Sequence, residues 1–226
     1  MAKKNSDATL PVHVTGASLG DAWEASIKAL VGVRRPLLEG EVGGPYIEAL
    51  NMIIHARSTS VSPVVSPRYR YAFLLSRPRS PAEPDEISAI RDRLEYWPAG
   101  DGALNQLEGI VSLLKRNLYS RRAVASLWNP CIDSTAFNAI SPCILQFYAR
   151  GPREAPKLGL TVLVRSSDAW VGAMADMWYF SRIQASIADA VEIQPGPYVH
   201  HAVSYHMYEQ DVPAGRELLL LDGGLE

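Results

Sequence analysis

The sequence predicts an α+β fold in which helices pack on one β-sheet. Helical spacing of apolar residues is typical of the first half of the chain, whereas short β-rich runs separated by turn residues follow after residue 120. The two kinds of segment do not alternate regularly, so a parallel sheet built from strand–helix–strand units is not expected.

The N-terminal half is predicted to be mainly helical. Residues 1–16 are expected to be a flexible lead-in and residues 17–226 a single domain. In "DAWEASIKALVG" (21–32) apolar residues recur at helical spacing up to Gly32, a typical helix stop. A strand is expected near the end of "PYIEALNMIIHA", and loops with a short strand at Tyr71–Leu75 in the Pro- and Ser-rich stretch that follows. Two further helices are predicted in "DEISAIRDRLEYW", capped by Asp85, and in "NQLEGIVSLLKRN".

The C-terminal half is predicted to hold strands around one long helix. Three β-rich runs, "RAVASLW", "CILQFYAR" and "LGLTVLVRS", precede the mostly apolar stretch "DMWYFSRIQASIADAVEI", which is long enough for a central helix. A last strand is expected in "GPYVHHAVSYHMY". Helices packed on a single sheet accommodate this order of elements.

Composition narrows the class of protein. With 22 basic and 24 acidic residues and a net charge of -2, the chain has no general electrostatic attraction for nucleic acid or an anionic membrane. No apolar run reaches the roughly 18 residues of a membrane span, and the N-terminus lacks the apolar core of a secretory signal. Two cysteines, Cys131 and Cys143, make neither a disulfide framework nor a zinc site. We therefore expect a soluble cytoplasmic protein with free thiols and no metal.

Cys143 in "ISPCILQFY" is the first candidate for chemistry. A cysteine in such a run is ordinarily a buried and inert side chain. It becomes a nucleophile only as a thiolate, which needs positive charge nearby. Arg165 would supply that charge if its strand lies beside the strand of Cys143, an adjacency that the sequence does not reveal.

Two pairs of polar residues suggest binding of an anion and of a sugar. Arg121 and Arg122 precede a predicted strand, where they form either a solvated pair or a bidentate clamp for phosphate. His206 and Tyr208 are two residues apart on a predicted strand and so share one face. They either pack at a sheet edge or point hydrogen-bonding groups at a sugar hydroxyl.

Together and in this order, these motifs resemble the thymidylate synthase superfamily. The resemblance rests on "NQLEGIVSLLKRNLYSRRAVASLWNP", the "PC" that ends at Cys143, "RSSD" at Arg165–Asp168, Gly172, and "HMY" at His206–Tyr208, and it covers roughly residues 104–210. It implies a thymidylate synthase-like catalytic domain over residues 17–226, with helices on a mixed sheet and a homodimer formed through the sheet.

The resemblance also implies a role for each matched residue. Cys143 would add to C6 of a pyrimidine nucleotide and make C5 nucleophilic toward the one-carbon unit of 5,10-methylenetetrahydrofolate. Arg165 and Ser166 would bind the phosphate, together with Arg121 and Arg122 from across the dimer interface. His206 and Tyr208 would hold the ribose. Two positions fall on the folate side: Asp168 and Gly172.

Asp176 in "RSSDAWVGAMADMW" departs from the family pattern, which has an asparagine here. The amide pairs with N3–H and O4 of uracil, whereas a carboxylic acid donates to N3 and accepts from N4 of cytosine. An ionised carboxylate would equally pair with cytosine protonated at N3. Aspartate at this position resembles the cytidylate 5-hydroxymethylases of the superfamily, among them a CMP hydroxymethylase of nucleoside-antibiotic biosynthesis of the mildiomycin type. The alternative is that Asp176 is only an N-cap for "MWYFSRIQ".

The implied reaction is 5-hydroxymethylation of CMP or dCMP, in which water adds to an exocyclic methylene on C5. We favour CMP, because the small Ala175 beside Asp176 leaves room for a 2′-hydroxyl. The alternatives are methylation of UMP or dUMP and a non-catalytic nucleotide-binding protein.

Three further positions depart from the family pattern. Val42 stands where the family has an arginine, so either Arg34 or Arg35 compensates or the other arginines suffice. Only two residues separate Cys143 from Gln146, so the turn at the nucleophile must differ. The early catalytic glutamate of the family is assigned first to Glu86, with Glu48 and Glu83 as alternatives.

Overall fold

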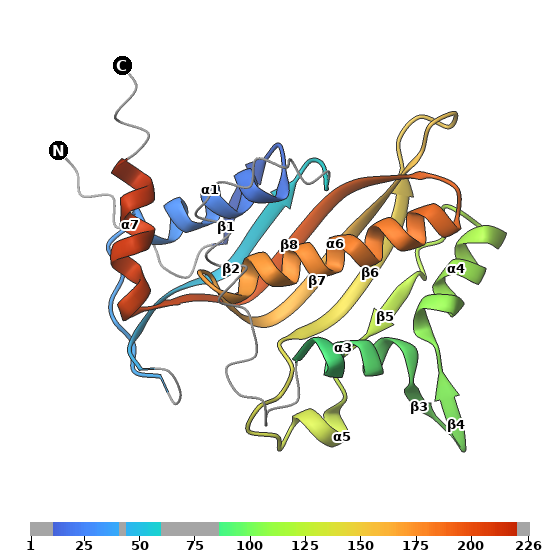
Figure 1. Ribbon diagram of the computed structural model, residues 1–226, viewed down its shortest axis with the longest axis horizontal. Helices are drawn as coiled ribbons and strands as arrows, with labels where there is room; N and C mark the ends of the chain where they lie inside the picture. Colours follow the sequence, from blue (N-terminus) through green and yellow to red (C-terminus); the bar gives the residue numbers. More distant parts are fainter. Residues whose placement is uncertain (1–10, 41–43, 60–85, 221–226) are drawn as a thin grey trace.

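A mixed six-stranded sheet forms the centre of the protein. The structure, a computed structural model, describes residues 11–40, 44–59 and 86–220 (Figure 1). The sheet order is β1-β2-β8-β7-β6-β5; the β1/β2 and β7/β8 pairs are parallel and the other pairs antiparallel, which confirms the predicted α+β class with a mixed sheet. The strands are β1 (Val12–Gly16), β2 (Tyr46–Ala56), β5 (Val124–Ser126), β6 (Pro142–Arg150), β7 (Lys157–Asp168) and β8 (Gln194–Tyr208), beside a small hairpin of β3 (Trp97–Ala99) and β4 (Gly102–Leu104).

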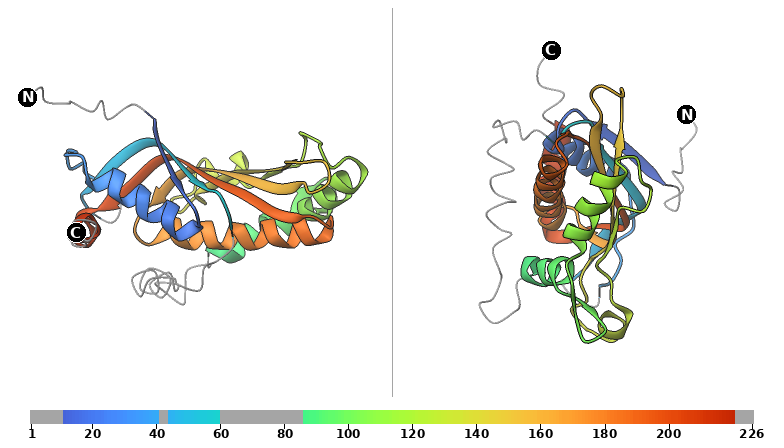
Figure 2. Two further views of the ribbon diagram at one scale, coloured as in Figure 1. Left: turned by 90° about the horizontal axis from the view of Figure 1, so that it is seen from above. Right: turned by 90° about the vertical axis from the view of Figure 1, so that its right-hand side faces the viewer.

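The two long helices, α1 and α6, lie on the same face of the sheet, as the views in Figure 2 show. The helices are α1 (Leu19–Val31), α3 (Glu86–Glu95), α4 (Gln106–Arg116), α5 (Pro130–Asp133), α6 (Gly172–Ala190) and α7 (Val212–Leu220), with the 3-10 helix η1 (Glu209–Asp211) before α7. Within the described ranges, no helix is both long and apolar enough to cross a bilayer.

Three predicted helices are confirmed, and their ends have local causes. Ser18 and Asp21 form a capping box at the start of α1, and Gly32 ends that helix. Asn105 caps α4, which buries Ile110 and Leu114 on its apolar face. The helix predicted in "DEISAIRDRLEYW" is α3, although its proposed cap, Asp85, lies outside the described residues, as does the strand predicted at Tyr71–Leu75.

The N-terminal strands extend further than the sequence predicted. The flexible lead-in expected over residues 1–16 is wrong for Val12–Gly16, because these residues form β1 and pair in parallel with β2. β2 likewise covers all of Tyr46–Ala56, whereas only the end of this segment was expected to be a strand. Both strands are stabilised by backbone pairing with residues distant in sequence. Such pairing leaves no pattern in the local sequence.

The sheet carries a kink where three neighbouring strands each lose one pairing. Asn51 of β2, with φ of 54°, and Val203 of β8 are skipped in the antiparallel pairing, and Arg165 of β7 is skipped beside Val203. On each strand, two consecutive residues at this point are not buried, after which the alternation of buried side chains resumes shifted by one residue. Beyond the kink, polar residues of three strands therefore lie on the face away from α1 and α6: Glu48, Ser166, Asp168, Ser204 and His206.

Candidate active site

Cys143 lies in a β-bulge between β6 and β7. The β6–β7 register shifts between Pro142 and Ile144, so Cys143 has no direct partner in the ladder. Its carbonyl oxygen accepts from the backbone N–H groups of both Leu127 and Trp128, at 2.8 and 3.3 Å. A bulge turns the bulged strand and re-aims its side chain.

Arg165 lies beside Cys143, as the sequence required for an activated thiol. Its backbone N–H donates to the carbonyl of Ser141, and its guanidinium donates from Nε to the carbonyl of Ile140 at 3.1 Å. The guanidinium also lies 5.9 Å from the ring centre of Trp128. A cavity of about 350 Å³ opens at this point, and its lining residues are Ser126, Trp128, Cys143, Ile144 and Arg165.

The thiol is not yet activated by this arrangement. Burial raises the pKa of Cys143 above its ordinary value, and the nearby Arg165 offsets this only in part. The half-buried thiol is therefore protonated at neutral pH, with Sγ 3.7 Å from the carbonyl oxygen of Ser141. A nucleophilic role consequently requires loss of the proton when a substrate is bound.

A row of ionisable side chains crosses three strands next to this cavity. Asp168 of β7, His206 of β8 and Glu48 of β2 are register partners from strand to strand. In the adjoining row, Ser166 Oγ lies 3.4 Å from His206 Nδ1, and Ser204 Oγ donates to Glu48 Oε1 at 2.5 Å. Ser166 directly follows Arg165, which lines the cysteine cavity.

His206 is the centre of that row. Its ring packs edge-on against those of Tyr46 and Tyr208, with centroids 5.6 and 5.2 Å apart. The ring contact confirms that His206 and Tyr208 share one face, as predicted. Burial lowers the pKa of His206, and the charges of Asp168 and Glu48 partly oppose that shift.

The loop before α6 fixes Asp168. Its Oδ1 accepts from the backbone N–H groups of Trp170 and Val171, at 2.9 and 3.3 Å, so one carboxylate oxygen holds the turn into the helix. Gly172 is the first residue of α6, and a side chain there would meet only the Cβ of Asp168, at an ordinary contact distance of 3.5 Å. The backbone at Gly172 therefore imposes no steric demand for glycine.

Asp176 does not cap a helix. α6 begins at Gly172, with Val171 in the cap position, so the alternative reading of Asp176 as an N-cap is wrong. The residues between are small or unbranched, which allows the helix to start earlier. Asp176 is half-buried in the second turn of α6, and its charge helps burial to raise the pKa of Tyr198 on β8.

Tyr198 belongs to a buried polar network under α6. Its hydroxyl lies 3.3 Å from His200 Nδ1, and His200 Nε2 lies 3.3 Å from Ser167 Oγ. Burial lowers the pKa of His200 to about 3, so the ring is neutral at neutral pH. A neutral imidazole has one donor and one acceptor nitrogen, which suits two hydroxyl neighbours.

The structure does not bring the predicted arginine pair to the cysteine of the same chain. Arg121 and Arg122 are exposed just before β5, and neither is among the residues that line the cavity at Cys143. Arg35, one of the two arginines considered as a replacement for the phosphate ligand missing at Val42, donates to the backbone carbonyls of Leu30 and Glu48. Arg34 is exposed, and Val42 lies outside the described residues.

The structure describes the side chain of only one of the three candidates for the early glutamate, Glu48. Glu86 begins α3, but its side chain is not among the described ones, and Glu83 lies outside the described residues. Glu48, the second choice, lies in the row with His206. The signal for it was present in β2, where Glu48 alternates with buried apolar residues.

A buried ion pair braces the loop that carries Trp128. Arg93 of α3 donates to Asp133 of α5 at 2.7 and 3.1 Å and to the carbonyl of Leu127 at 2.6 Å. Asp133 is only 4% exposed and also accepts from the backbone N–H of Asn129. Sequence reasoning missed this pair because its members are 40 residues apart.

Replacing Arg93 with alanine is expected to lower the free energy of unfolding by about 3 kcal/mol, because Asp133 would be left as an uncompensated buried charge. Urea denaturation measures the change. Arg91→Ala on the same helix, where the ion pair with Asp92 is exposed, should change it by less than about 0.5 kcal/mol. Equal stabilities of the Arg93 and Arg91 variants would contradict the prediction.

The difference is also expected to depend on pH. Hydrogen bonding to Arg93 holds the pKa of Asp133 below its usual range. The stability from this pair is therefore fully present above the ordinary pKa of an aspartate and is lost as the pH falls through the lowered value. The difference in the free energy of unfolding between the wild-type protein and Arg93→Ala should therefore become smaller at acidic pH.

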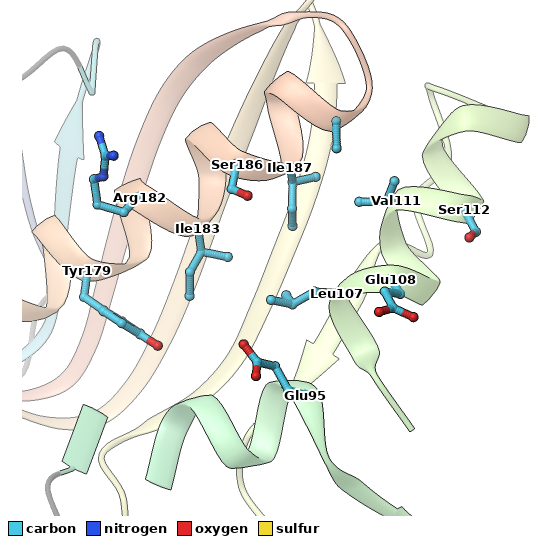
Figure 3. Close-up of a pocket in the computed structure, with 11 residues that line it drawn as sticks. Glu95, Leu107, Glu108, Val111, Ser112, Tyr179, Arg182, Ile183, Ser186 and Ile187 are labelled. Carbon is cyan, nitrogen blue, oxygen red and sulfur yellow. The ribbon is translucent and has the colours of Figure 1, made fainter. Parts of the chain in front are cut away.

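A larger groove of about 570 Å³ lies between α4 and α6 (Figure 3). Ile183 and Ile187 of α6 face Leu107 and Val111 of α4, with Glu95 of α3 at one end. None of the described residues that line this groove is among the predicted site residues. The smaller cavity at Cys143 is therefore the candidate active site.

Comparison with known proteins identifies the family of the chain. A family model described as thymidylate synthase matches residues 81–220. The chain belongs to the thymidylate synthase family. A protein of Methanocaldococcus jannaschii named "Putative thymidylate synthase" is 36% identical over 121 residues, which are 51% of this chain and 53% of that protein. The thymidylate synthase of Saccharomyces cerevisiae is 30% identical over 122 residues, which are 50% of this chain and 39% of the yeast protein. The chain thus aligns with about half or less of these curated relatives.

The thymidylate synthase match includes the bulge at Cys143, Asp176 on α6, and His206 and Tyr208 on β8. It begins after β2, so Glu48 lies outside it. Only the pairing of β2 with β8 brings Glu48 to the matched residues.

Proposed function

We propose that this protein is a cytidylate 5-hydroxymethylase, which uses 5,10-methylenetetrahydrofolate and water and prefers CMP to dCMP. The observation that carries the proposal is Asp176, which stands where the family pattern has a uracil-reading asparagine. Its half-buried place on α6 supports a role in reading a base rather than a surface or capping role. Such sites reject the wrong base because buried polar groups are left unpaired.

In this proposal Cys143 Sγ bonds to C6 of cytosine, and C5 becomes nucleophilic. C5 would form a bond to the one-carbon unit and lose its proton. The bond between that carbon and the folate nitrogen would then break, so that tetrahydrofolate leaves and an exocyclic methylene remains on C5. Hydroxide from water then adds to that methylene, and the Sγ–C6 bond breaks to restore the aromatic ring. Since burial raises the pKa of Cys143, formation of the thiolate is expected to accompany substrate binding.

The phosphate and the sugar are assigned to the residues around the kink. Arg165 and Ser166, consecutive on β7 beside the cysteine cavity, would bind the phosphate. His206 and Tyr208, whose rings are in contact, would hold the ribose. In this assignment the phosphate and the sugar would lie along neighbouring residues of β7 and β8.

Methylenetetrahydrofolate would supply the one-carbon unit. Asp168 fits a role on the folate side in part, because Oδ1 is engaged by the turn before α6 while a carboxylate has further acceptor sites on Oδ2. Gly172 follows that turn and would lie next to the same ligand. Glu86 stays our first assignment for the catalytic glutamate.

A homodimer formed through the sheet would complete the site. Arg121 and Arg122 are exposed and do not line the cavity at Cys143, so a partner's pair is the expected phosphate clamp. Exposed apolar residues on the strands support a covered face: Val124, Ile144 and Val203 are each about 40% exposed.

A second function is favoured by the names of the relatives. Both similar proteins are named thymidylate synthases, which supports methylation of UMP or dUMP as the alternative. A third reading, a nucleotide-binding protein without catalysis, is opposed by the cysteine at the bulge beside Arg165. The readings differ in which nucleotides labelled at C5 would release tritium.

Tritium release separates these readings. CMP, dCMP, UMP and dUMP, each labelled at C5, are incubated with the protein and methylenetetrahydrofolate. Release confined to the cytosine nucleotides supports the proposal, and its rate for CMP relative to dCMP reports the sugar preference. Release from UMP or dUMP alone overturns the reading of Asp176, and release from none of the four favours the binding protein.

Enlarging Ala175 is expected to harm CMP turnover more than dCMP turnover. Ala175 precedes Asp176 on α6 and is half-buried, so Ala175→Leu would fill the space required by a 2′-hydroxyl. Overpacking of this kind costs about 1–3 kcal/mol, which corresponds to roughly a tenfold fall in kcat/KM for CMP. Ala185→Leu, half-buried on the same helix about 15 Å away, is the control. Equal losses on CMP and dCMP would count against the role of Ala175.

A further inference from the structure

Glu48 is the member of the ionisable row that the family match does not include. It is the direct register partner of His206 across the β2–β8 pair, and His206 is the register partner of Asp168 across the β8–β7 pair. The kink at Asn51 turns Glu48 to the face away from the helices, beside Tyr46. A carboxylate therefore flanks the proposed ribose-binding histidine on the side opposite Asp168.

The position of Glu48 is well defined by hydrogen bonds. Its Oε1 accepts from Ser204 Oγ, and its backbone carbonyl accepts from Arg35 Nη1 at 3.1 Å. Backbone pairing with β8 also fixes the residues before and after Glu48, since Ile47 pairs with Met207 and Ala49 with Tyr205. A hydrogen-bonding side chain on a rigid strand is suited to recognising a ligand group at a fixed place.

Glu48 is not explained by an ion pair within the described residues. The ion pairs found in the described ranges join other residues: Lys28 with Glu24, Arg91 with Asp92, and Arg93 with Asp133. A carboxylate offers about four acceptor sites, and Ser204 occupies one of them. The remaining capacity suits neutral donors such as hydroxyl groups.

We infer that Glu48 determines the sugar preference by accepting a hydrogen bond from the 2′-hydroxyl of a ribonucleotide. The inference rests on the proposed function, which places the ribose at His206 and Tyr208. Acidic side chains bind ribose hydroxyls in this way in other nucleotide sites. A deoxyribonucleotide lacks the donor, so the half-buried carboxylate keeps Ser204 but loses the bond from the ligand, and discrimination follows from that unfilled acceptor site.

The expected effect is a collapse of the preference for CMP. Hydrogen bonds to charged groups correspond to about a 10- to 100-fold preference. Glu48→Ala should therefore lower the ratio of kcat/KM for CMP to that for dCMP about 10- to 100-fold. Glu48→Gln, which keeps an acceptor oxygen but loses the charge, should lower the ratio by less.

The experiment compares the wild-type protein with Glu48→Ala, Glu48→Gln and the control Glu24→Gln. Glu24 lies on α1 and pairs with Lys28, so its variant makes the same chemical change away from the row and should leave the ratio unchanged. Tritium release gives kcat/KM for each nucleotide, and calorimetric titration with CMP and dCMP gives binding ratios without turnover. Circular dichroism checks that each variant is folded.

The outcomes separate this inference from the proposed function. If the wild-type protein turns over uracil nucleotides instead, the assignment of the base is wrong. The role of Glu48 is then tested by the ratio of kcat/KM for UMP to that for dUMP. If no nucleotide is turned over, the binding ratio decides. The inference is overturned by a wild-type protein that does not prefer the ribonucleotide, by a ratio that persists in Glu48→Ala, or by equal losses on both sugars.

Discussion

Cys143→Ser is expected to abolish tritium release from the preferred nucleotide, with a loss of at least about 1,000-fold. A serine hydroxyl is a far weaker acid than a thiol, so at this position it would form the nucleophilic anion much less readily. Removal of a covalent nucleophile eliminates the reaction path that depends on it. The bulge that positions residue 143 is formed by backbone pairing, so the fold should not change.

The second cysteine is the matched control for this result. Cys131 is exposed on α5, and Cys131→Ser makes the identical chemical change away from the cavity. This variant should retain wild-type rates. Cys143→Ser should still bind the nucleotide in a calorimetric titration, because the phosphate and sugar contacts are intact. Full activity in Cys143→Ser would exclude the covalent mechanism.

Asp176→Asn is expected to exchange the base that the protein accepts. The amide presents an oxygen to N3–H and an N–H to O4 of uracil, while it mismatches N3 and N4 of cytosine. Two reversed hydrogen bonds in a partly buried site should change the ratio of cytosine to uracil turnover by at least about 100-fold. Tritium release from the four labelled nucleotides measures that ratio.

Asp189→Asn serves as the control for the exchange. Asp189 is exposed near the end of the same helix, so its variant alters the charge of α6 without approaching the base. The ratio of cytosine to uracil turnover should be unchanged in Asp189→Asn. A wild-type preference for uracil, or an unaltered ratio in Asp176→Asn, would show that Asp176 does not read the base.

The local elements were largely predictable from sequence. The start of α1 at Ser18 and the cap of α4 at Asn105 follow from side chains within three residues of each helix end. β6, β7 and β8 follow from their apolar and β-branched composition. The exceptions, β1 and the start of β2, are stabilised by backbone pairing with distant strands, which leaves no local pattern.

The candidate site was predictable only as a set of residue types in order. Arg165 was expected beside Cys143 on condition that their strands are neighbours, and the β6–β7 pairing meets that condition. The thiol pKa was not predictable, because burial depends on packing and here outweighs the nearby charge. The alternative that Asp176 is only an N-cap is wrong, because α6 begins one turn earlier, at Gly172.

The sequence by itself determined the class of fold, the long helices and the motifs that place the chain in the thymidylate synthase family, since periodicity, capping and motif order are local properties. Only the tertiary structure decided the kink across β2, β8 and β7, the bulge at Cys143, and the row from Asp168 through His206 to Glu48. These features arise from strand register, which pairs residues that are distant in sequence, by 19 positions for Ile144 with Leu163 and by 158 for Glu48 with His206. A shift of one residue in that register would turn Glu48 and His206 to the opposite face of the sheet.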